Sequence, residues 1–508
     1  MAPHELGFPL WVRLTHWFNF LFVALLIRSG IEILAAHPKL YWTEHCLPSR
    51  AWLKLTRKRM PSDEMWSSVD EEVECPPWLG LPGKENLGLG RYWHFASVLG
   101  WLIVGALYVG LMFASPQWRR LIPASWRVFP EAWRSFTMYA TLRLPEPAGA
   151  YNYDLNLPFN ALQQLAYFGL IFLLSPFMIL TGLAMSPSLG ARFPWYARLF
   201  GGRQSARSLH FLGMIGFLGF FAIHMLMVLV HGFPTEMGKM VLGEEKTARK
   251  LLATALGLGI IGLIVALIAA ANIVSLKCPR ATHRSLAFVV APIRNALFHR
   301  NVSIQNWPEE WTSSYFRANG YPPITAYPKA KGDDDEFERL LATDFADYRL
   351  RVFGLVEHPL SLSRDDLRAM SKREQTTIHS CIQGWTSIGK WGGTPLAEIL
   401  NRCRPRPEAR FLAFHSFGMH EKSGEPYYEC IDLELAKQDQ TILAYELNDE
   451  SLPLQHGAPL RLRVETKLGF KMVKFLRSIE FVEDFRTLGE GLGGVREDHQ
   501  QYDMGAHI

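Results

Sequence analysis

Five histidines lie within long apolar stretches of the first half of the chain or at their edges: His16, His94, His210, His224 and His231. Imidazole is costly in a membrane interior unless it has a polar partner or binds a metal. His210 and His224 are fourteen residues apart, which is about 40° short of four helical turns and roughly 21 Å along a helix axis. They therefore lie on one side of a helix, at two depths of a ~30 Å bilayer core.

The stretches that must carry these histidines have almost no charge. No Asp, Glu, Lys or Arg occurs within 92–118, 155–191, 208–235 or 251–276. Each stretch exceeds the ~20 residues that cross a bilayer as a helix. A fifth stretch, 7–37, contains Arg13, Arg28 and Glu32. It lacks a small-residue cleavage pattern after its apolar core, so we interpret it as a transmembrane helix rather than a secretory signal. The sequence predicts five membrane spans.

Following the chain back and forth across the membrane gives two pairs of histidines at matching depths. His16 pairs with His224, and His94 pairs with His210. Neutral imidazole is a good iron ligand, so these pairs predict two stacked b-type hemes that carry electrons across the membrane. For any one histidine, hydrogen bonding between helices explains the position equally well, but four at matched depths favour hemes. His231 has no depth partner and is predicted to lie at the interface.

The charges of the first span fit the same interpretation. Arg13 and Arg28 would be buried in lipid unless they are paired, and heme propionates are anionic groups that arginine binds well. Glu32, one turn after Arg28, is the alternative partner.

This half of the chain resembles the bacterial cytochrome b561 superfamily, which includes the di-heme membrane subunits of nickel-iron hydrogenases and formate dehydrogenases. The resemblance lies in "RLTHWFNFLFVALLIRSG", "RYWHFASVLGWLIVGALYVG", "NALQQLAYFGLIFLLSPFMILTGLAMSP" and the helix with two histidines, up to about Gly232. It implies two heme b groups bound by the four paired histidines. The long loop from His37 to Gly90 is not part of the expected pattern, and the sequence assigns it no role.

After Lys277 the chain changes to short apolar segments separated by charged and Pro/Gly-rich pieces, as in a soluble domain. Strands are predicted near 348–356, 375–381, 409–417, 441–447, 460–465 and 474–482, and helices at 363–370 and 394–403. Ser363 is the predicted N-cap of the first of these helices. We predict a membrane helical bundle at 1–277, a connector that wraps the soluble domain at 278–345, and a mixed α/β domain at 346–508.

Cys381 ends a predicted strand and begins a predicted loop that contains Gly384, Gly389, Gly392 and Gly393. Three interpretations compete. A buried structural thiol is the default. A catalytic nucleophile needs a base, and His379 shares its strand face only if the strand is regular. A single thiolate ligand suits a transition metal whose other ligands come from a cofactor.

A second cluster favours the metal-ligand interpretation. In "LQHGAPLRLRVETKLGFKMVK", His456, Arg461, Lys471 and Lys474 lie among glycine and proline residues. Arginine pairs with phosphate through two hydrogen bonds, and glycine lets the backbone approach a ligand closely, so the cluster suits a phosphate-bearing cofactor. The alternative is a solvated basic strand.

Together the two clusters resemble the sulfite-oxidase-type molybdopterin domain, in its branch of methionine-sulfoxide-reductase-like catalytic subunits. The matching pieces are "CIQGWTSIGKWGGTPL", "YYECIDLELA", "TILAYELNDESLPLQHGAPLRLRVE" and "GFKMVKFLRSIEF". The resemblance implies that Cys381 binds molybdenum, while the pterin is held by His456, Arg461 and the segment Met472, Val473 and Lys474. Ser416 and Asn319 match loosely as further cofactor contacts.

One residue departs from the sulfite-oxidase pattern. Sulfite oxidases have an arginine soon after the metal cysteine for their anionic substrate, whereas this chain has Trp385, which we expect at the reacting site. The departure argues against sulfite as the substrate.

We therefore expect a membrane-bound molybdenum oxidoreductase that couples quinone, through two hemes, to oxygen-atom transfer, with reduction of a small S- or N-oxide favoured. Two alternatives stay open: oxidation of a small substrate such as sulfite with electrons passed to quinone, and a di-heme cytochrome carrying a docking or sensory domain without a cofactor. The net charge of +5 gives no reason to expect nucleic acid as a partner.

We expect a bacterial inner-membrane location, in contact with membrane lipid, with the molybdenum domain on the periplasmic side. The family resemblance implies that side, and the twin-arginine-like Arg249-Lys250 before the fifth span fits export of a folded domain. A homodimer and a Cys46–Cys75 disulfide are left open.

Overall fold

The computed structural model describes residues 6–59, 65–143, 152–154, 157–244, 248–298, 304–332 and 335–505. The chain forms two compact units. The first unit contains Met1–Gly30, Tyr92–Leu183 and Leu209–Lys277, and the second contains Ile31–Arg91, Ala184–Ser208 and Cys278–Ile508. The second unit is thus assembled from three separate stretches, two of which come from between membrane spans.

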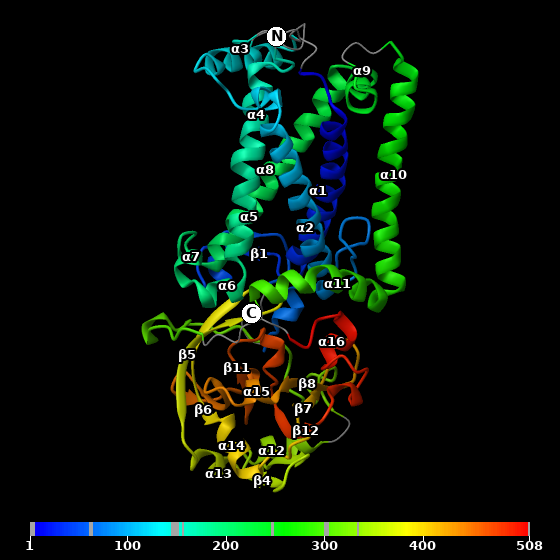
Figure 1. Ribbon diagram of the computed structural model, residues 1–508. Helices are drawn as coiled ribbons and strands as arrows, with labels where there is room; N and C mark the ends of the chain where they lie inside the picture. Colours follow the sequence, from blue (N-terminus) through cyan, green and yellow to red (C-terminus); the bar gives the residue numbers. More distant parts are fainter. Residues whose placement is uncertain are drawn as a thin grey trace. The chain divides into compact units, whose positions relative to one another are not determined.

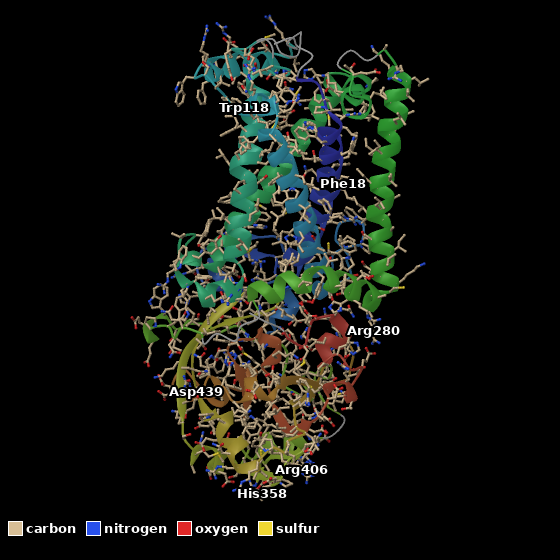
Figure 2. All side chains as sticks on the ribbon, viewed as in Figure 1. Phe18, Trp118, Arg280, His358, Arg406 and Asp439 are labelled. Atoms are coloured by element: carbon tan, nitrogen blue, oxygen red, sulfur yellow. The ribbon has the colours of Figure 1, made fainter. Side chains whose placement is uncertain are left out.

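Five helical segments are long and apolar enough to cross a membrane, which confirms the prediction (Figure 1). They are α1 (Leu10–Ala36), α2 (Leu87–Phe113), the run Ala161–Ala184, α8 (Arg203–Val230) and α10 (Lys250–Lys277). The third segment consists of α4 (Ala161–Phe168), a π-helical turn (Gly169–Leu174) and α5 (Ser175–Ala184). Side chains on the outside of the spans, such as Phe18, are exposed, as contact with lipid requires (Figure 2).

Aromatic contacts hold the first, second and fourth spans together within the first unit. Phe20 of α1 stacks on Phe221 of α8, with ring centroids 5.7 Å apart. Trp101 of α2 meets Phe217 of α8 edge to face at 6.3 Å. Such pairs add to packing where lipid and side chains are equally apolar. Among the described residues, four short helices complete the unit: the 3₁₀ helix η4 (Pro116–Arg120), α3 (Val128–Ala140), α9 (Phe233–Met237) and the π-helix η6 (Gly238–Leu242).

The second unit contains two five-stranded sheets. One has the order β10-β9-β6-β5, with β11 also paired to β9, and the other has the order β4-β3-β12-β7-β8. All neighbouring strands are antiparallel except β3 and β12, which run parallel. The strands are β3 (Leu350–Gly354), β4 (Leu360–Leu362), β5 (Arg373–Ser380), β6 (Thr386–Pro395), β7 (Phe411–Met419), β8 (Pro426–Asp432), β9 (Thr441–Leu447), β10 (Glu450–Ser451), β11 (Arg461–Val464) and β12 (Leu476–Val482). The predicted strands are all present.

The glycine-rich stretch after Cys381 is a strand rather than the predicted loop. Only Cys381–Trp385 forms a turn, with Ser380 paired to Thr386 across the hairpin. Gly384 has φ of 109°, a left-handed conformation that glycine adopts without strain. Gly389 and Gly393 lie in β6, where Gly393 packs directly on the backbone of Leu443 in β9. Glycine therefore serves close strand packing here.

The helices of the second unit include two of the predicted ones. These are α13 (Arg364–Arg368), which Ser363 caps through a capping box, and α14 (Leu396–Cys403). The predicted connector differs, because it contains the twenty-residue helix α11 (Pro279–Phe298) and the short α12 (Glu336–Ala342). Other short helices are α6 (Pro187–Arg192), α7 (Pro194–Arg198), α15 (Leu433–Ala436) and α16 (Val495–Gln500). Charged surface side chains such as Arg406 and Asp439 lie outside the sheets (Figure 2).

The loop between the first two spans is built into the second unit through a buried ionic cluster. Glu71 accepts from Lys39 and from Arg317, whose Nη1 lies 3.1 Å from Oε2 of Glu71. Arg317 also donates to the hydroxyl of Tyr41 at 2.6 Å. Burial would raise the pKa of Glu71, but His37, Arg317 and Lys39 together hold it at about 2. A buried carboxylate paired in this way costs several kcal/mol to leave unpaired, so the cluster fixes the loop in place.

Candidate functional site

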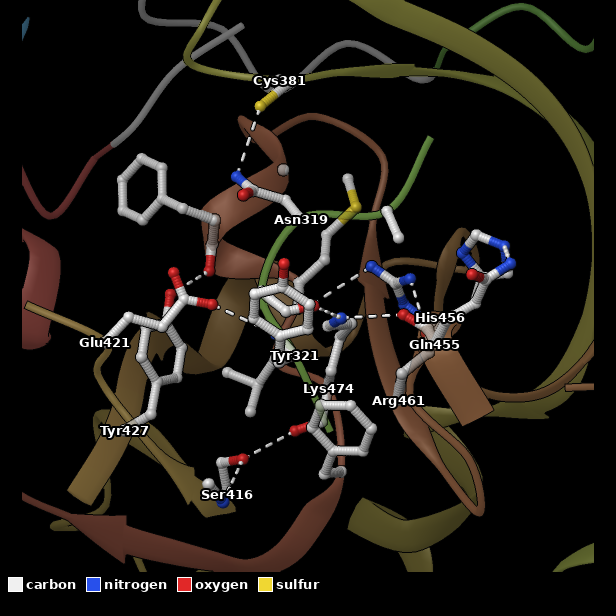
Figure 3. Close-up of a pocket in the computed structure, with 18 of the residues that line it drawn as sticks. Asn319, Tyr321, Cys381, Ser416, Glu421, Tyr427, Gln455, His456, Arg461 and Lys474 are labelled. Carbon is white, nitrogen blue, oxygen red and sulfur yellow. Dashed lines mark hydrogen bonds between the residues drawn. The ribbon is translucent and has the colours of Figure 1, made fainter. Parts of the chain in front are cut away.

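A cavity lies in the second unit beside Cys381. Five segments that are distant in the sequence line it. They are 316–321, the hairpin residues His379, Cys381 and Trp385, the end of β7 with the turn after it, residues 455–475, and Arg496. Figure 3 shows Cys381 beside Asn319, apart from Arg461, Lys474 and Ser416. The structure thus brings all the sequence-predicted molybdenum and pterin residues to one cavity.

The Cys381 sulfur is 2% exposed and has two polar neighbours. The amide Nδ2 of Asn319 lies 3.8 Å from it, and Oε1 of Gln383 lies 3.5 Å from it. Burial raises the pKa of Cys381 to about 12, so the sulfur carries a proton when nothing else binds it. A thiol of this kind is a poor nucleophile, whereas a metal cation displaces the proton and takes the thiolate as a ligand.

His379 does not act as a base for Cys381. Its Nδ1 lies 2.9 Å from Nη1 of Arg463, which pairs with Glu465 at 2.6 Å. Burial and the neighbouring arginines hold the pKa of His379 well below its ordinary value, so the ring is neutral and accepts from Arg463. The nucleophile interpretation of Cys381 therefore lacks its base.

Trp385 is 1% exposed and forms a rigid wall at the sulfur end of the cavity. Its Nε1 donates to Oε1 of Gln383 at 2.8 Å. The same oxygen approaches the cysteine sulfur, so Gln383 ties Trp385 to Cys381.

The basic end of the cavity is formed by His456, Arg461 and Lys474. Arg461 donates through Nη1 to the carbonyl of His456 at 2.8 Å and through Nη2 to the carbonyl of Met472 at 3.3 Å, while Lys474 donates to the carbonyls of Gly320 and Gln455. Burial, together with Arg461, lowers the pKa of Lys474 to about 7. Burial, with Lys474 and Arg461 nearby, lowers the pKa of His456 to about 3. At neutral pH His456 is therefore uncharged, and Lys474 is only partly protonated unless an anion binds beside it.

The remaining predicted contacts support that end. Met472 and Val473 are buried wall residues. Ser416 accepts from the backbone N–H of Gly418 at 3.0 Å and donates to the carbonyl of Lys474 at 2.8 Å, so it fixes the Lys474 backbone. Lys471 does not line the cavity as part of the basic cluster. It pairs instead with Glu429 at 2.9 Å and with Glu497. Lys471 is 0% exposed, and a buried ammonium group needs such carboxylate partners to offset the loss of water.

Several cavity residues carry no recognisable signal in the sequence. Arg496 reaches the cavity from α16, and Glu421 and Tyr427 reach it from either side of the turn before β8. Tyr427 donates to the carbonyl of Phe470 at 2.9 Å, and Glu421 accepts from the backbone of Tyr321 at 3.1 Å. Tyr427 begins the matching piece "YYECIDLELA", but no motif surrounds Arg496 and Glu421, and only the fold brings these two to the cavity.

The cavity fits a phosphate-bearing cofactor that presents a soft metal to Cys381. Nε of Arg461 and Oδ1 of Asn319 are both buried without a partner. A guanidinium with an unused donor, beside a buried lysine, suits a phosphate. The cysteine at the other end supplies the soft donor that a transition metal takes.

His16 and His224 lie side by side in the first unit. Their ring centroids are 6.2 Å apart. Two imidazoles on opposite sides of one metal, each with a bond of ~2 Å, require about this separation. Nδ1 of His16 is buried without a partner, and His224 stacks on Phe220 at 5.8 Å. The pair therefore fits one heme iron.

His94 and His210 are held in matching ways. Nδ1 of His94 lies 3.0 Å from the hydroxyl of Ser29, and Nδ1 of His210 lies 3.0 Å from the hydroxyl of Thr181. The His94 ring also lies against Gly30, the residue after Ser29, and the His210 ring lies against Gly182, the residue after Thr181. A hydrogen bond to one ring nitrogen fixes the tautomer and leaves the other nitrogen for a metal. Their pairing around a second iron stays a prediction.

The two arginines of the first span have different settings. Arg13 donates through Nη1 to the carbonyl of Val241 at 2.6 Å, and its Nε is buried without a partner. One donor of Arg13 is thus available for a propionate. The role of Arg28 stays a prediction. His231 lies 3.5 Å from the hydroxyl of Tyr139 at the end of α8, apart from the other histidines.

Cys46 and Cys75 do not form a disulfide. The sulfur of Cys46 accepts from the backbone N–H of Thr386 at 3.4 Å, next to the Cys381 hairpin. Cys75 packs against Gly80. Each sulfur therefore has its own buried place.

Two family models match the chain. Residues 7–243 match the prokaryotic cytochrome b561 family, and residues 338–487 match the oxidoreductase molybdopterin binding domain. Both resemblances expected from the sequence are confirmed. The five apolar helices followed by a β-rich domain agree with this fusion.

Curated relatives are similar to parts of the chain. A protein of Azospira oryzae named as a protein-methionine-sulfoxide reductase subunit, YedZ1, is 32% identical over 37% of this chain and 64% of its own length. The protein-methionine-sulfoxide reductase catalytic subunit MsrP of Xanthomonas campestris is 37% identical over 27% of this chain and 45% of its own. The chain thus spans less than two thirds of either relative.

Among solved structures, the sulfane dehydrogenase SoxCD of Paracoccus pantotrophus is 25% identical over 30% of this chain and 40% of that chain, with a TM-score of 0.26.

Proposed function

We propose, from the premise that this chain joins a prokaryotic cytochrome b561 segment to an oxidoreductase molybdopterin-binding domain, that it is a membrane-bound enzyme that reduces an S-oxide with electrons from quinol. The observation that carries the proposal is that one chain holds both a histidine pair spaced for a heme iron and a buried cysteine in a cavity where Nε of Arg461 has no partner. The names of the relatives, which are methionine-sulfoxide reductases, favour an S-oxide.

We propose two heme b groups in the first unit. His16 and His224 would bind one iron, and His94 and His210 the other, with Ser29 and Thr181 orienting the second pair. Histidines fourteen residues apart on α8 lie roughly 21 Å apart along the axis, so the two hemes would carry electrons across most of the bilayer. Arg13 and Arg28 would pair with propionates.

In the second unit, Cys381 would be the protein ligand of molybdenum, and Arg461, Lys474 and His456 would hold the pterin and its phosphate. When bound, this cofactor would supply a metal that takes the oxygen atom from the substrate and is then reduced by two electrons from the hemes. The chain's own groups have other tasks. Trp385 excludes water from the sulfur end, and Asn319 orients the cysteine with its amide. The reaction balances as R₂SO + 2e⁻ + 2H⁺ → R₂S + H₂O, and one quinol provides the electrons and protons.

We propose that the chain crosses the bacterial inner membrane five times and that the molybdenum domain is periplasmic. The parts would be the cytochrome at 1–277, the connector at 278–345 and the molybdenum domain at 346–508. A homodimer is compatible with this scheme.

The test uses the full chain, purified in mild detergent from a host that makes the molybdenum cofactor. We expect about two irons per molybdenum, reduction of the hemes by a quinol, and their reoxidation when a sulfoxide is added. Hemes that quinol reduces but no S- or N-oxide reoxidises would contradict the proposal. Reduction of the hemes by sulfite would support the opposite direction of electron flow.

A further inference from the structure

The loop between the first two spans carries a segment, Ser67–Glu72, that we name the brace. Its middle is a 3₁₀ helix (Ser68–Glu71) that Ser67 caps through a capping box with Asp70. Ser67 and Ser68 are both 0% exposed. A short, capped and buried segment of this kind has one fixed conformation.

The brace contacts the chain on both sides of Asn319. The backbone N–H of Ser68 donates to the carbonyl of Ala318 at 2.9 Å. The hydroxyl of Ser67 accepts from the backbone N–H of Gly320 at 2.8 Å. Tyr321, the next residue, donates through its hydroxyl to Asp70. The backbone that carries Asn319 is therefore held by the brace.

The brace also binds Gln383, two residues after Cys381. The amide Nε2 of Gln383 donates to the carbonyl of Ser68 at 3.2 Å and to Oε1 of Glu72 at 2.8 Å, and its Oε1 accepts from the Ser68 hydroxyl at 3.0 Å. This Oε1 is the atom near the cysteine sulfur. Through Gln383, the brace thus fixes the cysteine as well as the asparagine.

The sulfur end of the cavity is closed on this side. Gln383 and Trp385 are 1% exposed, and Gln383 links the brace to Cys381. Leu87, Phe470 and Tyr502 pack in the same hydrophobic cluster as Cys381.

The charges at this end compensate one another. Arg496 lines the cavity, and although burial alone would lower its pKa, Tyr427, Glu72 and Glu421 hold that pKa above its ordinary value. Lys422 binds Glu72 at 3.0 Å and Glu85 at 2.7 Å. A buried arginine already balanced by carboxylates gains little from an anionic ligand, because the ligand must compete with them.

We infer that the brace, acting through Glu72 and Gln383, makes the cavity selective for uncharged S-oxides over oxyanions. The inference rests on the proposed function for the reaction itself, which is the two-electron, two-proton reduction given above. It assigns a role to the loop from His37 to Gly90, which is not part of the cytochrome b561 pattern.

The experiment compares the full chain, loaded with cofactor, with Glu72→Gln and with Glu74→Gln as a matched control. Glu74 lies in the same loop and is exposed. Glu72→Gln keeps an acceptor for the Gln383 amide but removes one negative charge from beside Arg496. Sulfate binding, read from the EPR signal of the partly reduced molybdenum, is expected to tighten about tenfold in Glu72→Gln and to stay unchanged in Glu74→Gln.

Turnover with a reduced dye as donor tests the proposed reaction. Dimethyl sulfoxide is expected to be reduced by the unmodified chain. Sulfate binding that is equal in all three proteins would overturn the charge selectivity. If no S-oxide is reduced, the proposed reaction is wrong, and the sulfate titration still decides the charge selectivity because it needs no turnover.

Discussion

The two redox regions of this molecule are built in opposite ways. In the first unit, the proposed heme-ligand positions follow from the period of single helices, as His210 and His224 on α8 illustrate. In the second unit, the cavity gathers side chains from residues 316 to 496, most of them from turns and strand ends. The first kind of site depends on local geometry, and the second depends on the whole fold. The two should therefore respond differently to mutation.

The largest expected effect is at the cysteine. Cys381→Ala should abolish sulfoxide reduction and molybdenum retention, because no other cysteine lines the cavity among the described residues, while both hemes stay bound. Metal analysis and heme spectra measure the two results separately. Cys278→Ala, which changes an exposed cysteine, is the control. Loss of heme together with molybdenum would show that the two regions are not independent.

Removal of one heme ligand should be almost as severe but confined to the membrane. His16→Ala and His224→Ala should each lower iron from two to one per chain, since both variants remove the same heme. His94→Ala and His210→Ala should remove the other. Double variants within a pair should retain one iron, whereas His16→Ala with His94→Ala should retain none. His231→Ala should keep both hemes.

At the basic end of the cavity, Arg461→Ala should weaken cofactor retention by roughly tenfold to a hundredfold, because a charged hydrogen-bond donor to phosphate is lost. The molybdenum content after extended dialysis measures this. Arg402→Ala, on the exposed face of α14, should have no such effect. A normal molybdenum content in Arg461→Ala would remove this residue from the cofactor site.

The lowered pKa of Lys474 predicts that the stability of the second unit depends on pH in a way that the membrane region does not share. Its pKa is lowered to about 7 in the folded chain and is ~10.4 in an unfolded one. Above pH 7 the unfolded chain therefore holds a proton that the folded chain has lost, so stability rises with pH until the unfolded lysine titrates. The cofactor-free protein should thus show a higher Tm at pH 9 than at pH 7. In Lys474→Met this rise should disappear, and an equal rise in both proteins would assign it to other groups.

The smallest expected effect is at the hydroxyls that orient His94 and His210. Ser29→Ala or Thr181→Ala should weaken heme binding by about tenfold and shift the potential of one heme only, since each removes a single hydrogen bond to a ligand. Redox titration followed by optical spectra measures the shift. Ser115→Ala, whose hydroxyl donates to the carbonyls of Leu111 and Met112 and accepts from the backbone N–H of Gln117, should leave both potentials unchanged.

The contrast also explains what could be predicted from the sequence. The five spans and the approach of His16 to His224 follow from charge-free runs and helical period. The strands near Cys381 follow from short apolar runs, and Ser363 was recognisable as a cap. Gly389 and Gly393 were misinterpreted as loop residues because close packing between strands leaves the same glycine signal as a turn.

Other parts of the cavity could not have been found in this way. Arg496 lies in a six-residue helix with no motif, and it lines the cavity with Cys381, 115 positions earlier, only because the strands between them fold back. Glu72 and Ser68 are more remote still, since they belong to a loop between two membrane helices. Non-local contacts of this kind leave no periodic trace in the sequence.

The interleaved second unit has a consequence for how the protein is made. Residues 31–91 and 184–208 leave the ribosome before the sheets that they pack on exist, and Arg317 and Thr386 are their partners much later in the chain. The two early loops can bind each other, as Arg207 does through Nη2 to the carbonyl of His37 at 2.6 Å, but both must wait for their partners in the later chain. A gene fragment that begins at residue 278 would encode the sheets without these partners, and its product should aggregate rather than yield a soluble reductase.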